Sequence, residues 1–194
     1  MKGSGASDNL KILGIAGSLR RASYNKGVLR ASRELVPAGA SLEIFDLEGI
    51  SLFNQDHETK PTAQVTAMKA AVRAADALLF ATPEHNHSIP AALKNALDWG
   101  TRPFGDNAWA GKPAAILGAS PGMLGTARAQ IHLRQILVAL NMHPMGQPEV
   151  IIGNAADRFD ADGNLIDDKV KDRIRALLKS LISWTQRLGM PKSE

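Results

Sequence analysis

The chain of 194 residues contains no cysteine. This absence excludes disulfide bonds, thiolate metal sites, iron–sulfur ligation and a cysteine nucleophile, and it is compatible with a reducing cytoplasm. No run of about 18 apolar residues occurs, so we expect no transmembrane helix. Residues 1–9 lack the basic region and the apolar stretch of a signal peptide, and we expect a flexible tail there.

The chain also lacks a concentrated basic region. Its formal net charge is +4, but Lys and Arg are spread along the sequence without a block and without interleaved aromatic residues. This distribution argues against nucleic-acid binding. A diffuse positive charge instead favours small anions, such as nucleotide phosphates and oxyanions.

Two familiar phosphate-binding motifs are missing. The glycines at Gly14 and Gly17 do not form G-x-G-x-x-G, so a Rossmann dinucleotide site would lack its close-approach glycine. No G-K-[ST] occurs, which excludes a P-loop. Asp46 ends a predicted strand and resembles a ribose-binding acid, but we interpret it as a solvated strand end.

Short apolar segments alternate with helical patterns along the chain. Strands are expected at 10–16, 41–47, 77–82, 113–119 and 149–152. Helices are expected after Ser23, at 62–75, 91–99 and 126–140, and near the C-terminus. The alternation predicts an α/β fold, a five-stranded parallel sheet with helices on both faces, in one domain over 10–190. Ligands of such sheets bind beyond the carboxyl ends of the strands, where the loops after the first, third and fourth strands lie.

The loop after the first strand has the composition of a phosphate site. Its sequence is GSLRRASYN at 17–25, in which Ser18, Ser23 and Asn25 are neutral donors and Arg20 adds a charged fork. A helix N-terminus that follows such a loop contributes free N–H groups and the positive end of its dipole. The alternative is an ordinary turn in which Ser23 caps the helix.

The loop after the third strand, PEHNHSIP at 83–90, is polar and framed by two prolines. Such a loop is suited to holding a flat polar ring. Together the two loops predict a mononucleotide at the carboxyl edge of a parallel sheet, with FMN as the best candidate.

Three segments resemble the NADPH-dependent FMN reductase family, which has a flavodoxin-like three-layer sandwich and includes chromate, quinone and azo-dye reductases. They are GSLRRASYN, PEHNHSIPAALKNALDW and GASPGMLGTARAQIHLRQIL, within residues 12–149. The resemblance implies a cytoplasmic flavoenzyme, a homodimer or homotetramer, that transfers hydride from NADPH or NADH through bound FMN. The acceptors it implies are quinones and other small molecules, such as chromate or azo compounds.

The resemblance also implies roles for individual residues. Phosphate contacts would come from Ser18, Arg20, Ser23 and Asn25. The isoalloxazine ring would be lined, largely by backbone groups, by Pro83, Glu84, His85, Asn86, Ser88 and Ile89. Ser120 and Gly122 would approach from the other side, and oligomer contacts would fall near Arg128 and Glu149. The flavin carries the chemistry, so no side chain is expected to be catalytic in the strict sense.

The chain departs from the family at five positions. His85 replaces a common Tyr and His87 a common Gly, which bears on substrate preference and flavin stacking. Met123 and Thr126 replace frequent glycines, and Ile131 replaces a Tyr that forms an intersubunit hydrogen bond in some relatives.

Several other residues have more than one interpretation. His85 and His87 lack a third ligand nearby, so we expect no metal, and we place His85 beside the flavin edge. Arg102 is expected to meet a nucleotide phosphate or an oxyanion substrate, with a solvated helix-end arginine as the alternative. Trp109 is expected to be structural, or else to border the site of a neighbouring subunit.

Two other functions stay open at this point. One is a flavodoxin-type electron carrier, although flavodoxins are typically acidic and this chain is basic. The other is a flavin reductase for which FMN is a diffusing substrate. The sequence leaves open the physiological acceptor, the preference between NADH and NADPH, and the choice between dimer and tetramer.

Overall fold

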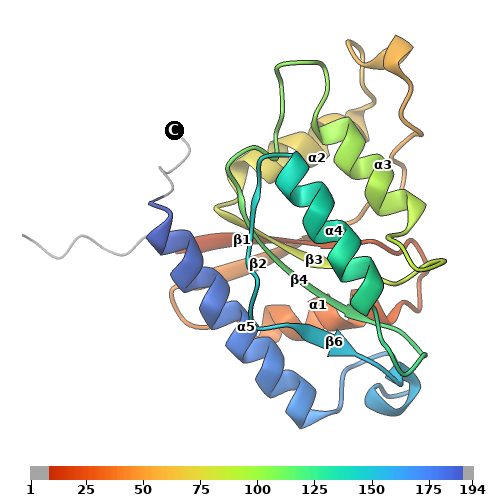
Figure 1. Ribbon diagram of the computed structural model, residues 1–194, viewed down its shortest axis with the longest axis vertical. Helices are drawn as coiled ribbons and strands as arrows, with labels where there is room; N and C mark the ends of the chain where they lie inside the picture. The colour runs from red at the N-terminus through yellow and green to blue at the C-terminus, as the bar shows by residue number, and fades with distance from the viewer. Residues whose placement is uncertain (1–8, 190–194) are drawn as a thin grey trace, which may run out of the picture.

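A parallel sheet forms the centre of the protein, which a computed structural model describes for residues 9–189 (Figure 1). Every strand pairing in it is parallel, and the spatial order is β2-β1-β3-β4-β5, with β6 also paired to β4. The strands are β1 (Leu10–Ala16), β2 (Ala40–Phe45), β3 (Ala77–Ala81), β4 (Pro113–Ala119), β5 (His143–Pro144) and β6 (Val150–Ile152). The predicted N-terminal tail lies outside the described residues apart from Asn9.

The fifth position of the sheet differs from the prediction of one continuous strand. Two short segments lie along β4: β5 pairs with its first residues, Pro113 and Ala114, whereas β6 pairs with its last three. Pro148 lies in the segment between β5 and β6 and has no N–H to donate to the ladder. The sequence pattern predicted β6 but not β5, because a strand of two residues carries no periodic pattern.

Helices cover both faces of the sheet and make three layers (Figure 1). On one face, α1 (Tyr24–Leu35) and α5 (Asp168–Arg187) pack against the strands. On the other face lie α2 (Ala63–Ala74), α3 (Ala91–Gly100) and α4 (Ala127–Ala139). Short 3-10 helices occur at Gln55–His57 and Ala155–Arg158. This arrangement confirms the predicted three-layer sandwich.

Side-chain capping marks the start of α1 and of α5. The Ser23 hydroxyl accepts a hydrogen bond from the Asn25 N–H at 3.2 Å, which confirms the predicted N-cap of α1. Asp167 caps α5 in the same way, by accepting from the Val170 N–H at 3.0 Å. Within the described part of the chain, no helix has the length and apolar character needed to cross a membrane.

Candidate active site at the carboxyl edge of the sheet

The larger of two adjoining cavities, about 610 Å³, lies beyond the carboxyl ends of β1, β3 and β4. Three of the predicted loops meet there. The lining residues are Gly17, Ser18, Leu19, Arg20, Ser23, Tyr24, Asn25, Pro83, His85, Pro90, Ala91, Ala92, Ala119 and Pro121. The structure therefore brings together the predicted phosphate loop and part of the predicted ring loop.

Positive charge and helix geometry make the first loop suitable for an anion. Among the described residues that line the larger cavity, Arg20 carries the only full charge. Its guanidinium donates to the Ala22 carbonyl and lies 5.8 Å from the centre of the Tyr24 ring. The first turn of α1 contains no acidic residue, so the positive end of the helix dipole is not neutralised there.

Asn25 has a structural contact that the sequence analysis missed. Its side chain is buried, with 2% exposed, and bridges α1 to the end of β4. The amide nitrogen donates to the Ala119 carbonyl and the amide oxygen accepts from the Ala119 N–H, both at 2.9 Å. A phosphate contact from this side chain would require the pair to break, so the predicted role of Asn25 stays a prediction that competes with this bridge.

The smaller cavity, about 430 Å³, is lined by residues that neighbour those of the larger one in sequence. It is lined by Glu84, Asn86, His87, Ser120, Gly122, Met123, Leu124, Gly125 and Arg128. Residues of the second and third loops thus alternate between the cavities: Pro83 and His85 border the larger one, and Glu84 borders the smaller one. This alternation follows from extended backbone, in which successive side chains point to opposite sides.

A tight hairpin forms the tip of the second loop. The backbones of His85 and Ser88 exchange two hydrogen bonds of 2.9 Å, and Asn86 and His87 between them have φ of 49° and 64°. Two consecutive positive φ values are those of a type I′ turn, which matches the twist of paired extended segments. His87 therefore occupies a backbone conformation that favours glycine, the residue that the resemblance implies at this position.

Glu84 directs its side chain toward the N-terminus of α4. One carboxylate oxygen accepts from the N–H groups of Arg128 at 3.0 Å and Ala129 at 3.2 Å, and the other accepts from Arg128 Nε at 2.7 Å. Burial alone would raise the pKa of Glu84, but these hydrogen bonds and the Arg128 charge outweigh it and hold the pKa below its usual value.

Four predicted residues border neither cavity. The Ile89 side chain is in the apolar core with 8% exposed, and the Ser88 hydroxyl bonds to His132 of α4 at 3.1 Å. Glu149 pairs with Arg134 at 3.5 Å within the chain. The oligomer contact of Glu149 stays a prediction. The fourth residue is Arg102.

Arg102 lies beyond the last turn of α3, whereas the first residues of that helix border the larger cavity. At 1.5 Å per residue, about 15 Å of helix separate them. The guanidinium lies 3.7 Å from Glu58 and 5.7 Å from the centre of the Phe53 ring, and buried Lys69 donates to the Arg102 carbonyl. Its anion contact stays a prediction, and unchanged Michaelis constants in Arg102→Ala would contradict it.

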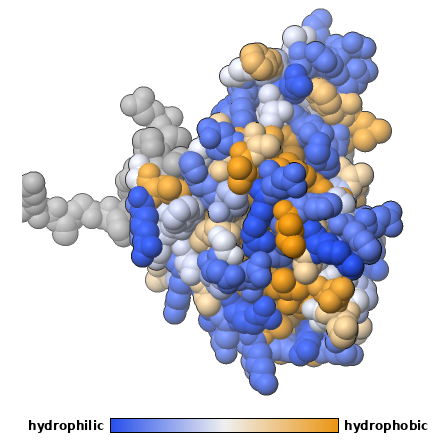
Figure 2. Space-filling model, in the orientation of Figure 1, coloured by the Kyte–Doolittle hydropathy of each residue, from blue (hydrophilic) through white to orange (hydrophobic). Residues whose placement is uncertain are grey.

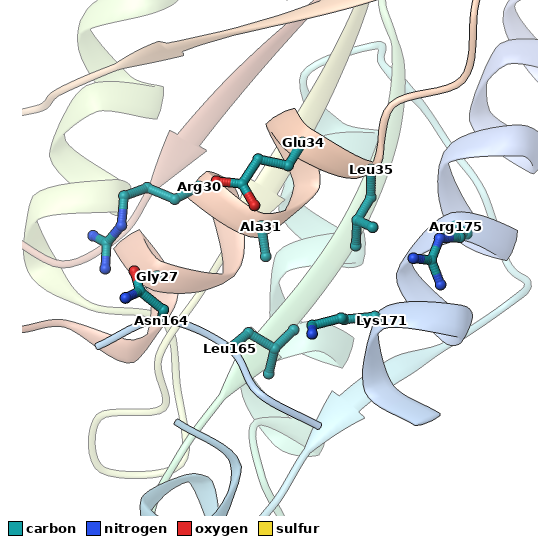
Figure 3. Close-up of a pocket in the computed structure, with 9 residues that line it drawn as sticks. All are labelled: Gly27, Arg30, Ala31, Glu34, Leu35, Asn164, Leu165, Lys171 and Arg175. Atoms are coloured by element: carbon teal, nitrogen blue, oxygen red, sulfur yellow. The ribbon is translucent and has the colours of Figure 1, made fainter. Parts of the chain in front are cut away.

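A third cavity, about 240 Å³, lies between α1, α5 and the turn that contains Asn164 (Figure 3). Arg30, Lys171 and Arg175 border it, and Figure 3 shows Lys171 and Arg175 extending from α5 toward α1. It shares no lining residue with the two cavities at the sheet edge. The chemistry predicted from the loops therefore belongs to the sheet edge.

The residues at the sheet edge fit FMN. Arg20, the Ser18 and Ser23 hydroxyls and the N-terminus of α1 form a donor set for a phosphate, next to a cavity bordered by proline, alanine and the hairpin. The fold and this site define an α/β protein that binds a mononucleotide at the switch edge of its sheet.

Comparisons with known proteins identify the family. Residues 10–157 match the model of the NADPH-dependent FMN reductase family. The chain is 51% identical over 183 residues to an NAD(P)H-dependent FMN reductase of Pseudomonas aeruginosa, covering 94% of this chain and 98% of that protein. It is 40% identical over 177 residues to a 2-hydroxy-1,4-benzoquinone reductase of a Burkholderia species, covering 91% and 97%. The chain belongs to the NADPH-dependent FMN reductase family.

A solved structure supports the same assignment. The flavoenzyme FerB of Paracoccus denitrificans, an NAD(P)H:(acceptor) oxidoreductase, superposes with a TM-score of 0.84 at 32% identity and covers 92% of this chain and 98% of that one. The comparisons confirm the predicted family, the fold, and an FMN-dependent oxidoreductase that uses NAD(P)H. The individual site residues stay predictions supported by their position.

Proposed function

We propose that this protein transfers a hydride from NADPH or NADH through bound FMN to quinones, with chromate and azo compounds as further acceptors. One observation carries the proposal: the larger cavity combines a cationic phosphate loop with an open, weakly polar space at the switch edge. Quinone acceptors are supported by the 2-hydroxy-1,4-benzoquinone reductase relative.

Binding is assigned to backbone groups and small side chains. Ser18, Ser23 and Arg20 hold the phosphate, and the hairpin at 85–88 lies against the ring. Ser120 and Gly122 approach from the side of the smaller cavity. When bound, FMN accepts two electrons with a proton as hydride and passes them on, so the protein needs no side-chain nucleophile.

The site must also leave space for the hydride donor, NADPH or NADH, and then for the quinone acceptor. The larger cavity opens to solvent beside Arg20 and His85, which are both exposed. A cation at this opening attracts the nucleotide phosphates of NADPH and anionic acceptors. His85 lies where it can contact either partner.

Association of subunits is part of the proposal, through an apolar stripe on α4 and the loop before it. Met123, Leu124, Ile131 and Val138 are exposed by 79%, 53%, 62% and 64%. Figure 2 shows hydrophobic residues, between hydrophilic ones, on the face of the molecule where α4 lies. We assign the stripe, with Arg128 and Glu149 at its border, to the contact of a homodimer or homotetramer. A cytoplasmic location, where NADH and NADPH are available as hydride donors, is also part of the proposal.

A visible spectrum of the purified protein tests the function. Under anaerobic conditions, one equivalent of NADPH is expected to bleach the flavin bands, and a quinone is expected to restore them. A yellow protein that NADPH leaves oxidised would indicate an electron carrier instead. Loss of flavin on a desalting column would indicate that FMN is a diffusing substrate, and Arg20→Ala should weaken FMN binding if the phosphate loop is correctly assigned.

A further inference from the structure

Two side-chain contacts join the hairpin segment 84–88 to α4, one helical turn apart. Glu84 binds the first turn of α4 at Arg128, and Ser88 binds His132 four residues later. We propose that Glu84 and His132 are positioning residues, which form a clamp that sets the place of the ring-binding hairpin. The inference rests on the proposed FMN site, but its contacts are observed without it.

The Glu84 contact replaces the cap that α4 lacks. Thr126 is the N-cap residue of α4, but its side chain makes no capping hydrogen bond and instead accepts from Gln130 at 3.0 Å. The first turn of α4 also contains no acidic residue. The Glu84 carboxylate, with 8% of its side chain exposed, supplies both the acceptor and the negative charge that a helix N-terminus favours.

The His132 contact fixes the opposite end of the hairpin. Ser88 is paired with His85 through the backbone, and its hydroxyl lies 3.1 Å from His132 Nδ1. His132 is exposed on α4 and borders neither cavity. It therefore acts on a ligand only through the segment it holds, which is why we call it a positioning residue.

Held at both ends, the hairpin presents its backbone in one place. His85 borders the larger cavity, and Asn86 and His87 border the smaller one. Small displacements of such groups weaken both binding and orientation of the reacting partners. The clamp also links the hairpin to the helix whose outer side carries the apolar stripe.

The test compares His132→Leu, which removes the polar contact, with His132→Asn, which keeps a polar atom near Nδ1. His57→Leu is the matched control, because His57 is an exposed histidine in the 3-10 helix at Gln55–His57. Two quantities are measured on the full-length protein: hydrogen exchange of the 83–89 segment, with and without FMN, and the Kd of FMN from quenching of its fluorescence.

We expect His132→Leu to speed hydrogen exchange of the His85 and Ser88 amides and to raise the Kd of FMN. Each change should be about fivefold, the size expected when one hydrogen bond is lost. His132→Asn should restore most of both, and His57→Leu should change neither. Unchanged exchange and Kd in His132→Leu, or failure of His132→Asn to restore them, would overturn the clamp. If the wild-type protein binds no FMN, the proposed function fails, while the exchange data still decide the clamp.

Discussion

The bridge from Asn25 to Ala119 leads to a test that separates a structural role from phosphate binding. In Asn25→Ala, the N–H and the carbonyl of Ala119 lose their partners at a position where only 2% of that residue is exposed. An unpaired buried backbone group costs about 1–3 kcal/mol, so we expect the free energy of unfolding to fall by about 3 kcal/mol. In a chain of this size that corresponds to a Tm lower by about 6–12 °C.

Urea unfolding of the FMN-free protein measures this loss, because a ligand contact cannot contribute there. Asn25→Asp should also destabilise, although it is close to isosteric, since a carboxylate oxygen replaces the donor that faces the Ala119 carbonyl. Arg33→Ala, on an exposed position of the same helix, is the control. If Asn25→Ala unfolds like the wild type and loses only FMN affinity, the bridge is not what stabilises this corner, and the phosphate role is favoured.

Three further changes probe the loops and the core. The folded-state pKa of Glu84 is lowered from 4.5, so the stabilisation that its carboxylate gives the fold is complete above about pH 4.5 and is lost as the pH falls through the lower value. Glu84→Gln should therefore lower the free energy of unfolding, measured with urea, more near neutral pH than at about pH 3. An equal loss at both pH values would contradict the ionic contact. His87→Gly should raise the free energy of unfolding by about 0.5–1 kcal/mol by relieving a φ of 64°, and a fall would reveal a side-chain contact that outweighs the strain. A Cβ on Gly100 would lie 2.0 Å from Trp109 Nε1, so Gly100→Ala should lower stability by about 3 kcal/mol in the same assay, and a small effect would mean that the buried indole can move.

The position of Trp109 distinguishes between the two roles that the sequence allowed for it. Its side chain is fully buried, and its indole N–H donates to the Leu97 carbonyl at 3.0 Å. The ring lies 6.1 Å from the ring of Phe80 in β3. These contacts favour the structural interpretation over a role at the site of a neighbouring subunit.

Local signals in the sequence were sufficient for all of the longer strands and helices and for the edge where the candidate site lies. The apolar run of β4 was predicted with the observed bounds, Pro113–Ala119, and Ser23 was predicted as the cap of α1. Both depend on residues within one strand or one helical turn, and so they can be inferred without knowing the fold. The position of the loops after β1, β3 and β4 then follows from the rules of parallel sheets.

Only the tertiary structure decided which side chains meet. Asn25 and Ala119 are 94 residues apart, and Glu84 and Arg128 are 44 apart, so no local pattern pairs them. The split of the fifth strand likewise depends on which groups of β4 lie beside a short segment. The sequence by itself determined most of the strands and helices, the cap of α1 and the loop chemistry, because these are local. The clamp, the Asn25 bridge and the two cavities depend on distances between segments, which only the packed chain sets.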